Sequence, residues 1–203
     1  MGMPAIKRHW TSADVRALMD ESRPWPRYEL IDGELLVTPS PGWAHQFAIG
    51  EIIPILHAYL EKERVGLACP SPADLELRPG TITQPDVFVV PAAAEAPAEA
   101  EAGSWSDIHS LLLAIEVMSP SSTRTDRVTK REFYLDVGVP DYCIVDVDAR
   151  IVERWSPERQ TPLVLRDEWV WQPVGARTPL TVVLPDLFDR IADNLRRAGI
   201  RSR

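Results

Sequence analysis

Apolar runs alternate with polar, proline-rich and glycine-rich breaks along the chain, and the middle of the chain shows the order of elements most clearly. Apolar residues recur at helical spacing from Trp43 to about Glu63, which predicts a helix that Pro54 kinks or splits. A second helix is expected from about Asp126 to Val137. Strands are expected in the apolar runs at 65–68, 87–90, 111–118 and 142–147, with a further strand at 74–78.

Shorter elements are expected on both sides of this middle region. Thr11 or Ser12 can cap a short first helix. Asp32-Gly33 separates two apolar-rich runs, and this dipeptide is typical of a tight hairpin because both central residues of a type I′ turn need a positive φ. Towards the C-terminus, strands or hairpins and a last amphipathic helix are expected at 151–155, 163–171, 180–184 and 186–198. The pattern therefore predicts an α/β fold with the core order α-β-β-β-α-β and extra β-hairpins at both ends.

The composition is that of a folded protein. The 203 residues fit one domain, 1–203, and 45% hydrophobic residues supply a core, so wholesale disorder is excluded. Cys69 and Cys143 form neither a disulfide framework nor a cysteine-based zinc site. The chain has no apolar run of the length that a signal peptide or a membrane helix needs. We therefore expect a cytoplasmic protein without membrane association.

The net charge of −8 is unevenly distributed. Residues 91–107 are rich in Ala, Glu and Pro and carry no Lys or Arg, so we expect an acidic, solvated loop within the domain. By contrast, Arg124, Arg127, Lys130 and Arg131 form a basic stretch. The net charge argues against tight non-specific coating of nucleic acid, but a local basic patch can still contact a phosphate backbone.

Glu116 is the most informative residue, because it interrupts the apolar run 111–118. An isolated carboxylate in a buried strand costs several kcal/mol unless it is paired, hydrogen-bonded or bound to a metal. The alternative is a glutamate at the end of the strand that reaches solvent or a single arginine.

Asp86 follows Pro85 and opens the apolar run 87–90. Alone, Pro-Asp is ordinary turn chemistry. Asp86 and Glu116 together would repel each other in neighbouring buried strands unless a cation lay between them, and Mg²⁺ or Mn²⁺ suits such oxygen ligands.

Lys130 shares one face of its predicted helix with apolar and aromatic residues, which places the ammonium group towards the sheet carboxylates. Alternatively, its long stem reaches past the rings to solvent. Arg124, Arg127 and Arg131 lie on the flank of this helix, solvated or facing phosphate.

Glu34 and His45 are weaker candidates. Glu34 follows the Asp-Gly turn and shares a strand face with Leu36, so it is either a solvated hairpin residue or part of a site. His45 lies near the start of a helix and can contact a substrate or cap the helix. Four histidines without an HxxxH pair do not favour a histidine-built metal site. The sequence has no GxSxG, Walker or GxGxxG motif, which excludes serine hydrolases, P-loop NTPases and Rossmann dehydrogenases.

Three stretches together resemble a known family. They are YELIDGELLVTPSPGWAHQ (28–46), QPDVFVV (84–90) and AIEVMSPSSTRTDRVTKREFYLDVGVPDYCIVDVDAR (114–150). They are similar to the Uma-two family of bacterial restriction endonucleases, a branch of the PD-(D/E)XK nuclease superfamily, over about residues 10–190. The resemblance implies a restriction-endonuclease-like core, with a central mixed sheet flanked by helices, and Mg²⁺-dependent (or Mn²⁺-dependent) hydrolysis of DNA phosphodiester bonds.

The resemblance also assigns roles to residues. It implies that Asp86, Glu116 and Glu34 bind the metal. On their positions and charge, Arg124, Arg127 and Arg131 are expected to hold the DNA backbone, with His45 as a further substrate contact. Met118 stands where the superfamily has its lysine, and the resemblance implies that Lys130 takes over this role. Cys143 replaces a tryptophan found in many relatives, which changes packing and leaves the acidic set intact. By analogy with enzymes that cut both DNA strands, we expect a homodimer.

Two other functions remain open at this point. The chain can be a non-catalytic binding module that retains a nuclease fold as a scaffold. It can also be a metal-independent hydrolase in which Glu116 and Asp86 act as an acid/base pair.

Overall fold

A six-stranded mixed sheet forms the centre of the protein. The computed structural model describes residues 9–19, 26–92, 104–119 and 125–200. The order across the sheet is β3-β4-β5-β6-β7-β8, with β5 and β6 parallel and the other neighbours antiparallel. Its strands are β3 (Gly66–Pro70), β4 (Val87–Pro91), β5 (Leu113–Val117), β6 (Tyr142–Asp146), β7 (Ile151–Trp155) and β8 (Leu163–Leu165).

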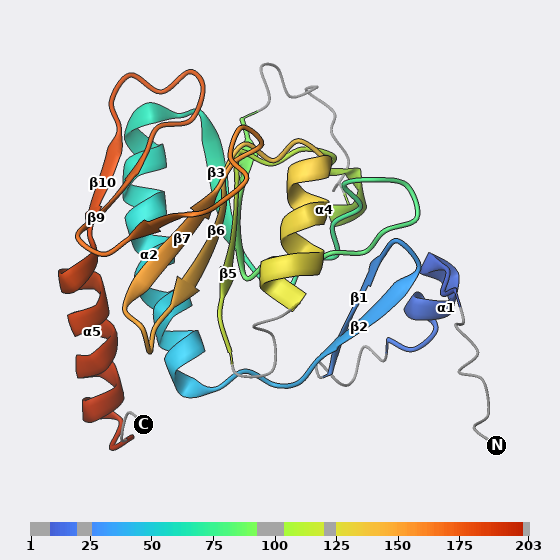
Figure 1. The fold of residues 1–203 in the computed structure, drawn as a ribbon, viewed down its shortest axis with the longest axis horizontal. Coiled ribbons are helices and arrows are strands. Elements are labelled where there is room, and N and C mark those ends of the chain that lie inside the picture. Colours follow the sequence, from blue (N-terminus) through green and yellow to red (C-terminus); the bar gives the residue numbers. More distant parts are fainter. Residues whose placement is uncertain (1–8, 20–25, 93–103, 120–124, 201–203) are drawn as a thin grey trace.

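Helices cover both faces of this sheet (Figure 1). On one face lie α2 (Trp43–Glu63) and α5 (Leu184–Arg197), together with a two-stranded sheet of β9 (Glu168–Trp171) and β10 (Leu180–Val183). On the other face lies α4 (Arg131–Asp136). Successive strand side chains point to opposite faces, so Leu113, Ile115 and Val117 pack under α2 and α5 while Ala114 packs under α4.

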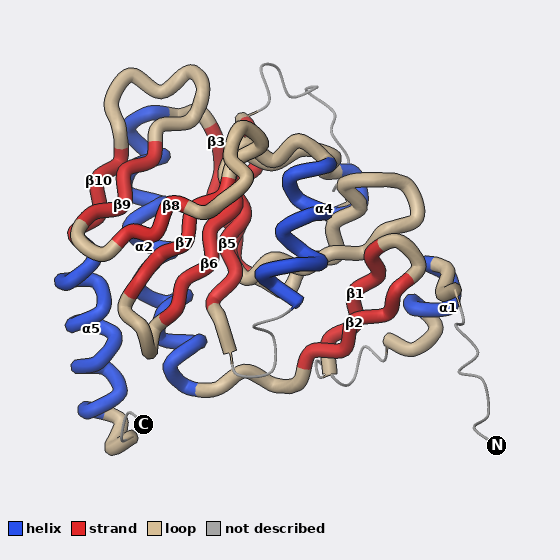
Figure 2. The backbone as a smooth tube through the Cα atoms, viewed as in Figure 1, coloured by secondary structure: helices blue, strands red, loops and turns tan. Residues whose placement is uncertain are grey.

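A separate hairpin of β1 (Arg27–Ile31) and β2 (Glu34–Thr38) lies beside α4, as the tube view shows (Figure 2). Asp32 and Gly33 have φ of +50° and +78°, as a type I′ turn requires. Hydrogen bonds between Leu30 and Ile82 tie the hairpin to the loop before β4. The short helix α1 (Ser12–Arg16) packs on the hairpin and begins at a capping box formed by Thr11 and Asp14.

The predicted α/β fold is confirmed, including the core order, in which α2, β3, β4, β5, the helical segment and β6 follow one another. The strand predicted at 74–78 is wrong, because only Leu75 pairs there, with Thr83. Pro54 does not split α2, which runs unbroken from Trp43 to Glu63. Pro54 and Gly50 are exposed, so the Gly50 carbonyl that loses its amide partner to proline faces water instead of the core.

Two further differences are local, and one predicted segment is not tested. The run at 163–171 forms two strands that belong to different sheets, since a turn at 166–167 redirects the chain. The helix predicted from Asp126 begins with a π-helical turn, Asp126–Lys130, before α4. Most of the predicted acidic loop, 93–103, lies outside the described residues, and a short 3-10 helix at Trp105–Asp107 follows it.

Within the described part of the chain, no helix is both long and apolar enough to span a membrane. Cys69 and Cys143 are free thiols. Burial raises the pKa of the Cys143 thiol far above its usual range, so this cysteine is a packing residue.

Candidate functional site

Asp86 and Glu116 lie next to each other where β4 begins and β5 ends. Val87 pairs with Ile115 in the antiparallel register, which places the preceding residue, Asp86, opposite Glu116. The Val117 amide donates a hydrogen bond of 2.9 Å to Asp86 Oδ2. Both carboxylates are buried. The structure therefore brings together the two acids that the sequence singled out.

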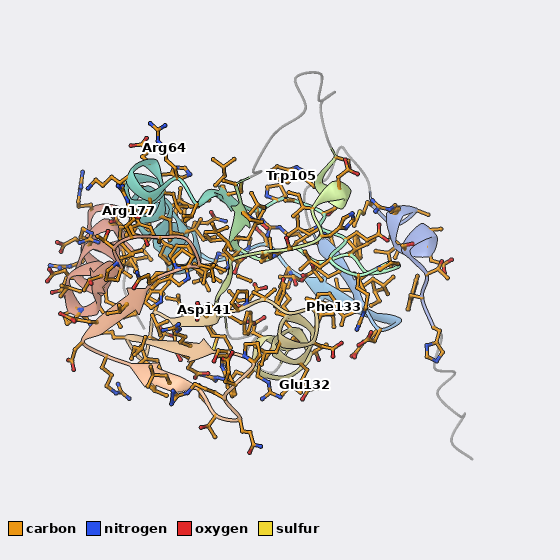
Figure 3. All side chains as sticks on the ribbon, turned by 90° about the horizontal axis from the view of Figure 1, so that it is seen from above. Arg64, Trp105, Glu132, Phe133, Asp141 and Arg177 are labelled. Carbon is orange, nitrogen blue, oxygen red and sulfur yellow. The ribbon has the colours of Figure 1, made fainter. Side chains whose placement is uncertain are left out.

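Lys130 reaches the same point from the π-helical turn. The side-chain alternation of β5 directs Glu116 towards α4, and Lys130 Nζ lies 2.9 Å from Glu116 Oε1. The predicted core-facing position of Lys130 is confirmed, since Lys130 is buried together with the aromatic residues Phe133 and Tyr134. Figure 3 looks along α4 and shows exposed Glu132 on the opposite side from Phe133. A π-turn often marks a functional site, and here it carries the site's ammonium group.

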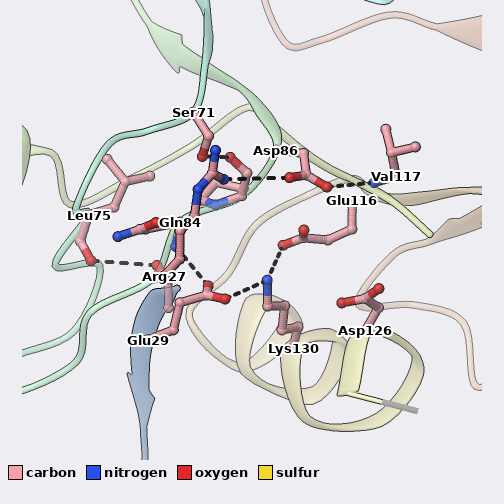
Figure 4. A network of polar contacts seen from close by, with 12 residues as sticks. Arg27, Glu29, Ser71, Leu75, Gln84, Asp86, Glu116, Val117, Asp126 and Lys130 are labelled. Carbon is pink, nitrogen blue, oxygen red and sulfur yellow. Dashed lines mark hydrogen bonds and ion pairs between the residues drawn. The ribbon is translucent and has the colours of Figure 1, made fainter. Parts of the chain in front are cut away.

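Glu29 of β1 is a further acid in this cluster that the sequence reasoning missed. Its Oε2 lies 2.8 Å from Lys130 Nζ, and its Oε1 accepts a 2.8 Å hydrogen bond from the Gln84 amide. The Lys130 ammonium thus lies between two buried carboxylates, Glu29 and Glu116 (Figure 4). The sequence held a signal for Glu29, because this acid interrupts an apolar-rich strand run as Glu116 does.

Asp86 has two basic neighbours. His45, in the first turn of α2, places Nε2 2.9 Å from Asp86 Oδ2, so this histidine is part of the cluster. Arg27 of β1 places a guanidinium nitrogen 3.8 Å from Asp86 Oδ1, and sequence reasoning did not single it out. The His45 Nδ1 atom is buried and has no hydrogen-bond partner in the described structure.

Burial and neighbouring charges shift the pKa values of the cluster in different directions. Burial raises the pKa of Asp86, but the hydrogen bond and charge of His45, with the charge of Lys130, bring that pKa below its ordinary value. Burial and the nearby carboxylates raise the pKa of Glu116 well above its usual range, although Lys130 opposes this. Burial lowers the pKa of Lys130, but Glu116 and Glu29 outweigh this effect and hold it well above the usual value, so Lys130 is charged.

The site forms a cavity of about 170 Å³. Its lining includes the buried acids, Lys130, His45 and Arg27, with hydroxyl groups from Ser40 and Ser119. Four buried carboxylates outnumber the neighbouring cations, since Asp126 lines the cavity as well. A cation bound among these carboxyl groups would favour their ionised forms, which burial and mutual repulsion disfavour at Glu116.

A divalent cation at this site would have Asp86 and Glu116 as its protein ligands. Among the described residues, no three His, Cys, Asp or Glu side chains are grouped as a ready-made metal cage. Mg²⁺ typically binds through one or two carboxylates and completes its shell with water and substrate phosphate. Two adjacent carboxylates in a polar cavity meet that requirement.

The structure places the remaining predicted residues elsewhere. Glu34 is exposed and lines a different cavity, of about 1220 Å³, between the hairpin turn and α4. Arg127 is held by Glu153, with Nη2 to Oε1 at 2.6 Å, rather than facing the site. Arg131 stacks over the Trp155 ring at 4.8 Å and lines the same large cavity as Glu34. Arg124 lies outside the described residues.

Comparisons with known proteins agree with this architecture. A protein-family model, Uma2, described as "Putative restriction endonuclease", matches residues 14–185. The fold is similar to a crystal structure from Anabaena variabilis described as "a putative nuclease belonging to DUF820", with a TM-score of 0.71 and 21% sequence identity. That match covers 90% of this chain and 99% of the other. No curated protein matches the sequence.

Proposed function

Because the chain belongs to the Uma2 family of restriction-endonuclease-like proteins, we propose that it is an endonuclease that uses Mg²⁺ or Mn²⁺ to hydrolyse DNA phosphodiester bonds. The observation that carries the proposal is the convergence of Asp86, Glu116 and Lys130 from three separate elements on one buried point. Burying two acids and an ammonium costs free energy, and a catalytic role accounts for keeping them there.

Each residue has a role that follows from its position. A bound divalent cation supplies polarisation of a phosphate oxygen and lowers the pKa of a water molecule. Asp86 and Glu116 would hold that cation, and the His45 ring at 2.9 Å keeps the Asp86 carboxylate oriented. The Lys130 ammonium would orient the attacking water or stabilise negative charge that develops on the phosphate.

Arg27 is the side chain best placed to contact the DNA backbone at this site. It lines the cavity, and its guanidinium nitrogen lies on the Asp86 side of the cluster. Guanidinium groups bind phosphate in a planar, directional manner. Arg127 and Arg131, which are engaged by Glu153 and by Trp155, are not assigned this role.

Nicking of supercoiled plasmid DNA in the presence of Mg²⁺ tests the proposal. Asp86→Asn, Glu116→Gln and Lys130→Ala are each expected to lower the nicking rate by about 100-fold or more. Glu34→Gln is the matched control, because it removes a carboxylate charge outside the cavity. Melting curves verify that the variants are folded. Wild-type activity in Asp86→Asn or Glu116→Gln would remove that residue from the proposed mechanism.

A second function, a non-catalytic module that retains the fold, is favoured by two observations. Lys130 already neutralises Glu116, and no ready-made metal cage exists among the described residues. Calorimetric titration with Mn²⁺ separates the two functions. Binding that is lost in Asp86→Asn supports the enzyme, whereas no binding supports the module. Nicking that survives a chelator would instead indicate an acid/base mechanism without metal.

We further propose that the enzyme acts as a homodimer, since one site of this kind cuts one strand and two copies related by a two-fold axis would cut both. Sedimentation of the purified chain tests this proposal, and a monomer at working concentrations would contradict it.

A further inference from the structure

Lys130 is shared almost equally between two acids. Its Nζ lies 2.8 Å from Glu29 and 2.9 Å from Glu116, and only 6% of its side chain is exposed. The two glutamate side chains are each 3% exposed. An ammonium group has three N–H donors, so it can bond to both carboxylates at once. Among the described residues, these are the acids with which Lys130 forms ion pairs.

The two acids differ in what else they serve. Glu116 is a proposed ligand of the divalent cation, and its Oε1 is already occupied by Lys130. Glu29 belongs to the hairpin, and the Gln84 backbone amide holds its other oxygen in place. Gln84 is itself held by Asp74, at 2.5 Å from the amide nitrogen of its side chain. Glu29 is therefore a fixed acceptor on the side of Lys130 that faces away from Glu116 (Figure 4).

A divalent cation and an ammonium group compete for the same carboxylate. When both contact Glu116, their positive charges repel each other in a buried cavity, where screening by water is weak. The ammonium group needs another acid close by if it is to release Glu116 without being left buried and unpaired.

We propose that Glu29 is a positioning residue that holds Lys130 when a divalent cation binds Glu116, so that the N-terminal hairpin sets the metal affinity of the site. This inference rests on the proposed metal-dependent function. In this inference, β1, which lies outside the six-stranded sheet, supplies the acid that holds Lys130. Without Glu29, Lys130 retains only its ion pair with Glu116 and opposes the metal directly.

A double-mutant cycle with Mn²⁺ binding as its readout tests the inference, because it isolates the coupling between two residues. Glu29→Gln in the wild-type background is expected to weaken Mn²⁺ binding by about tenfold. In a Lys130→Met background, which lacks the competing ammonium group, the same substitution is expected to change the affinity by less than about twofold. Isothermal calorimetry on the full chain measures all four dissociation constants.

Two further variants test whether Glu29 acts through its contact with Lys130 or only through its negative charge. Glu29→Asp keeps the negative charge but withdraws the carboxylate from Lys130, and it is expected to weaken Mn²⁺ binding as Glu29→Gln does. Glu34→Gln, on the same hairpin but outside the cavity, is expected to leave the affinity unchanged. Melting curves establish that each variant is folded.

The outcomes distinguish this inference from the proposed function. If Glu29→Gln weakens Mn²⁺ binding equally in both backgrounds, Glu29 acts through its charge or as a ligand, and the positioning role is overturned. The same conclusion follows if Glu29→Gln has no effect in the wild-type background. If the wild-type protein binds no Mn²⁺, the proposed function fails and the inference fails with it.

Discussion

Replacing Arg127 by alanine tests whether this arginine is structural or contacts DNA. The Arg127 guanidinium makes two hydrogen bonds to Glu153 Oε1, at 2.6 and 3.0 Å, and lies 3.7 Å from Asp146. The side chains of Glu153 and Asp146 are about one-tenth exposed. Arg127 belongs to the π-helical turn, so its pairing also ties the turn that carries Lys130 to β7.

The expected cost follows from the burial of the acids. Removing one partner of a buried ion pair costs about 3–5 kcal/mol, but a third of the Arg127 side chain is exposed, so we expect about 2–3 kcal/mol for Arg127→Ala. In a domain of this size, that corresponds to a melting temperature lower by about 4–12 °C. Arg131→Ala is the matched control, since it removes a stack on Trp155 and an ion pair with exposed Glu132, together worth about 1 kcal/mol.

Urea unfolding monitored by circular dichroism measures these free energies. The double variant Arg127→Ala, Glu153→Gln is expected to lose at least about 1 kcal/mol less than the sum of the two single variants, because each single change leaves the other group unpaired. If Arg127→Ala unfolds within about 0.5 kcal/mol of wild type, or if the two changes simply add, then the pair is not structural. In that case a phosphate-binding role for Arg127 would be restored.

Three other changes have defined outcomes. Gly33→Ala is expected to destabilise the hairpin by about 1–2 kcal/mol in a thermal melt, because φ is +78° and a Cβ atom would lie 2.9 Å from His9 Nδ1; an unchanged melt would show that the turn relaxes. Tyr59→Phe is expected to cost about 1 kcal/mol in urea unfolding, since it removes the 2.7 Å hydrogen bond from the Tyr59 hydroxyl to the carbonyl of exposed Thr178, and a cost near zero would mean that water replaces it. Mn²⁺ at 100 times its dissociation constant should raise the unfolding free energy by about 2.7 kcal/mol, with no such rise in Asp86→Asn; an equal rise in that variant would place the metal elsewhere.

Glu116 and Lys130 were predictable because each breaks an otherwise apolar pattern. A charge at a core-facing position needs a partner, and the partners are the ones expected, since Lys130 lies 2.9 Å from Glu116. Asp86 carried a weaker signal, and it gained meaning only from its position at the start of the strand next to that of Glu116.

The hairpin shows where sequence reasoning stopped. Glu29 is the cross-strand neighbour of Leu36, and Glu34 that of Ile31, so both glutamates lie on the same face of the hairpin. The sequence could therefore show that the two glutamates share a face. The cross-strand pair of Glu29 lies about 7 Å along the strand from the pair of Glu34, however, and only Glu29 reaches the cavity. Which of the two glutamates lies in the cavity depends on how the hairpin is positioned against the rest of the protein, and local sequence patterns do not contain that information.

The partner of Arg127 in the basic stretch could not be predicted for a related reason. Periodicity places Arg127 on the flank of its helix, but it does not reveal which strand lies beneath that flank. The pairing of β6 with β7 sets Glu153 opposite Ile144 on the face that α4 covers, and this acid binds Arg127. Such a neighbour comes from the order of strands in the sheet, which local patterns do not contain.

The widened helical turn at Asp126–Lys130 also sets the directions in which its two cations point. It directs Arg127 towards β7 and Lys130 towards β5, a wider spread than three successive steps of an α-helix allow. An in-frame loss of one codon in this turn would restore ordinary helical winding and bring the two cations together. The proposed site therefore depends on the length of this turn as well as on the identity of Lys130, so a one-residue deletion here is expected to displace the ammonium group while every site residue is retained.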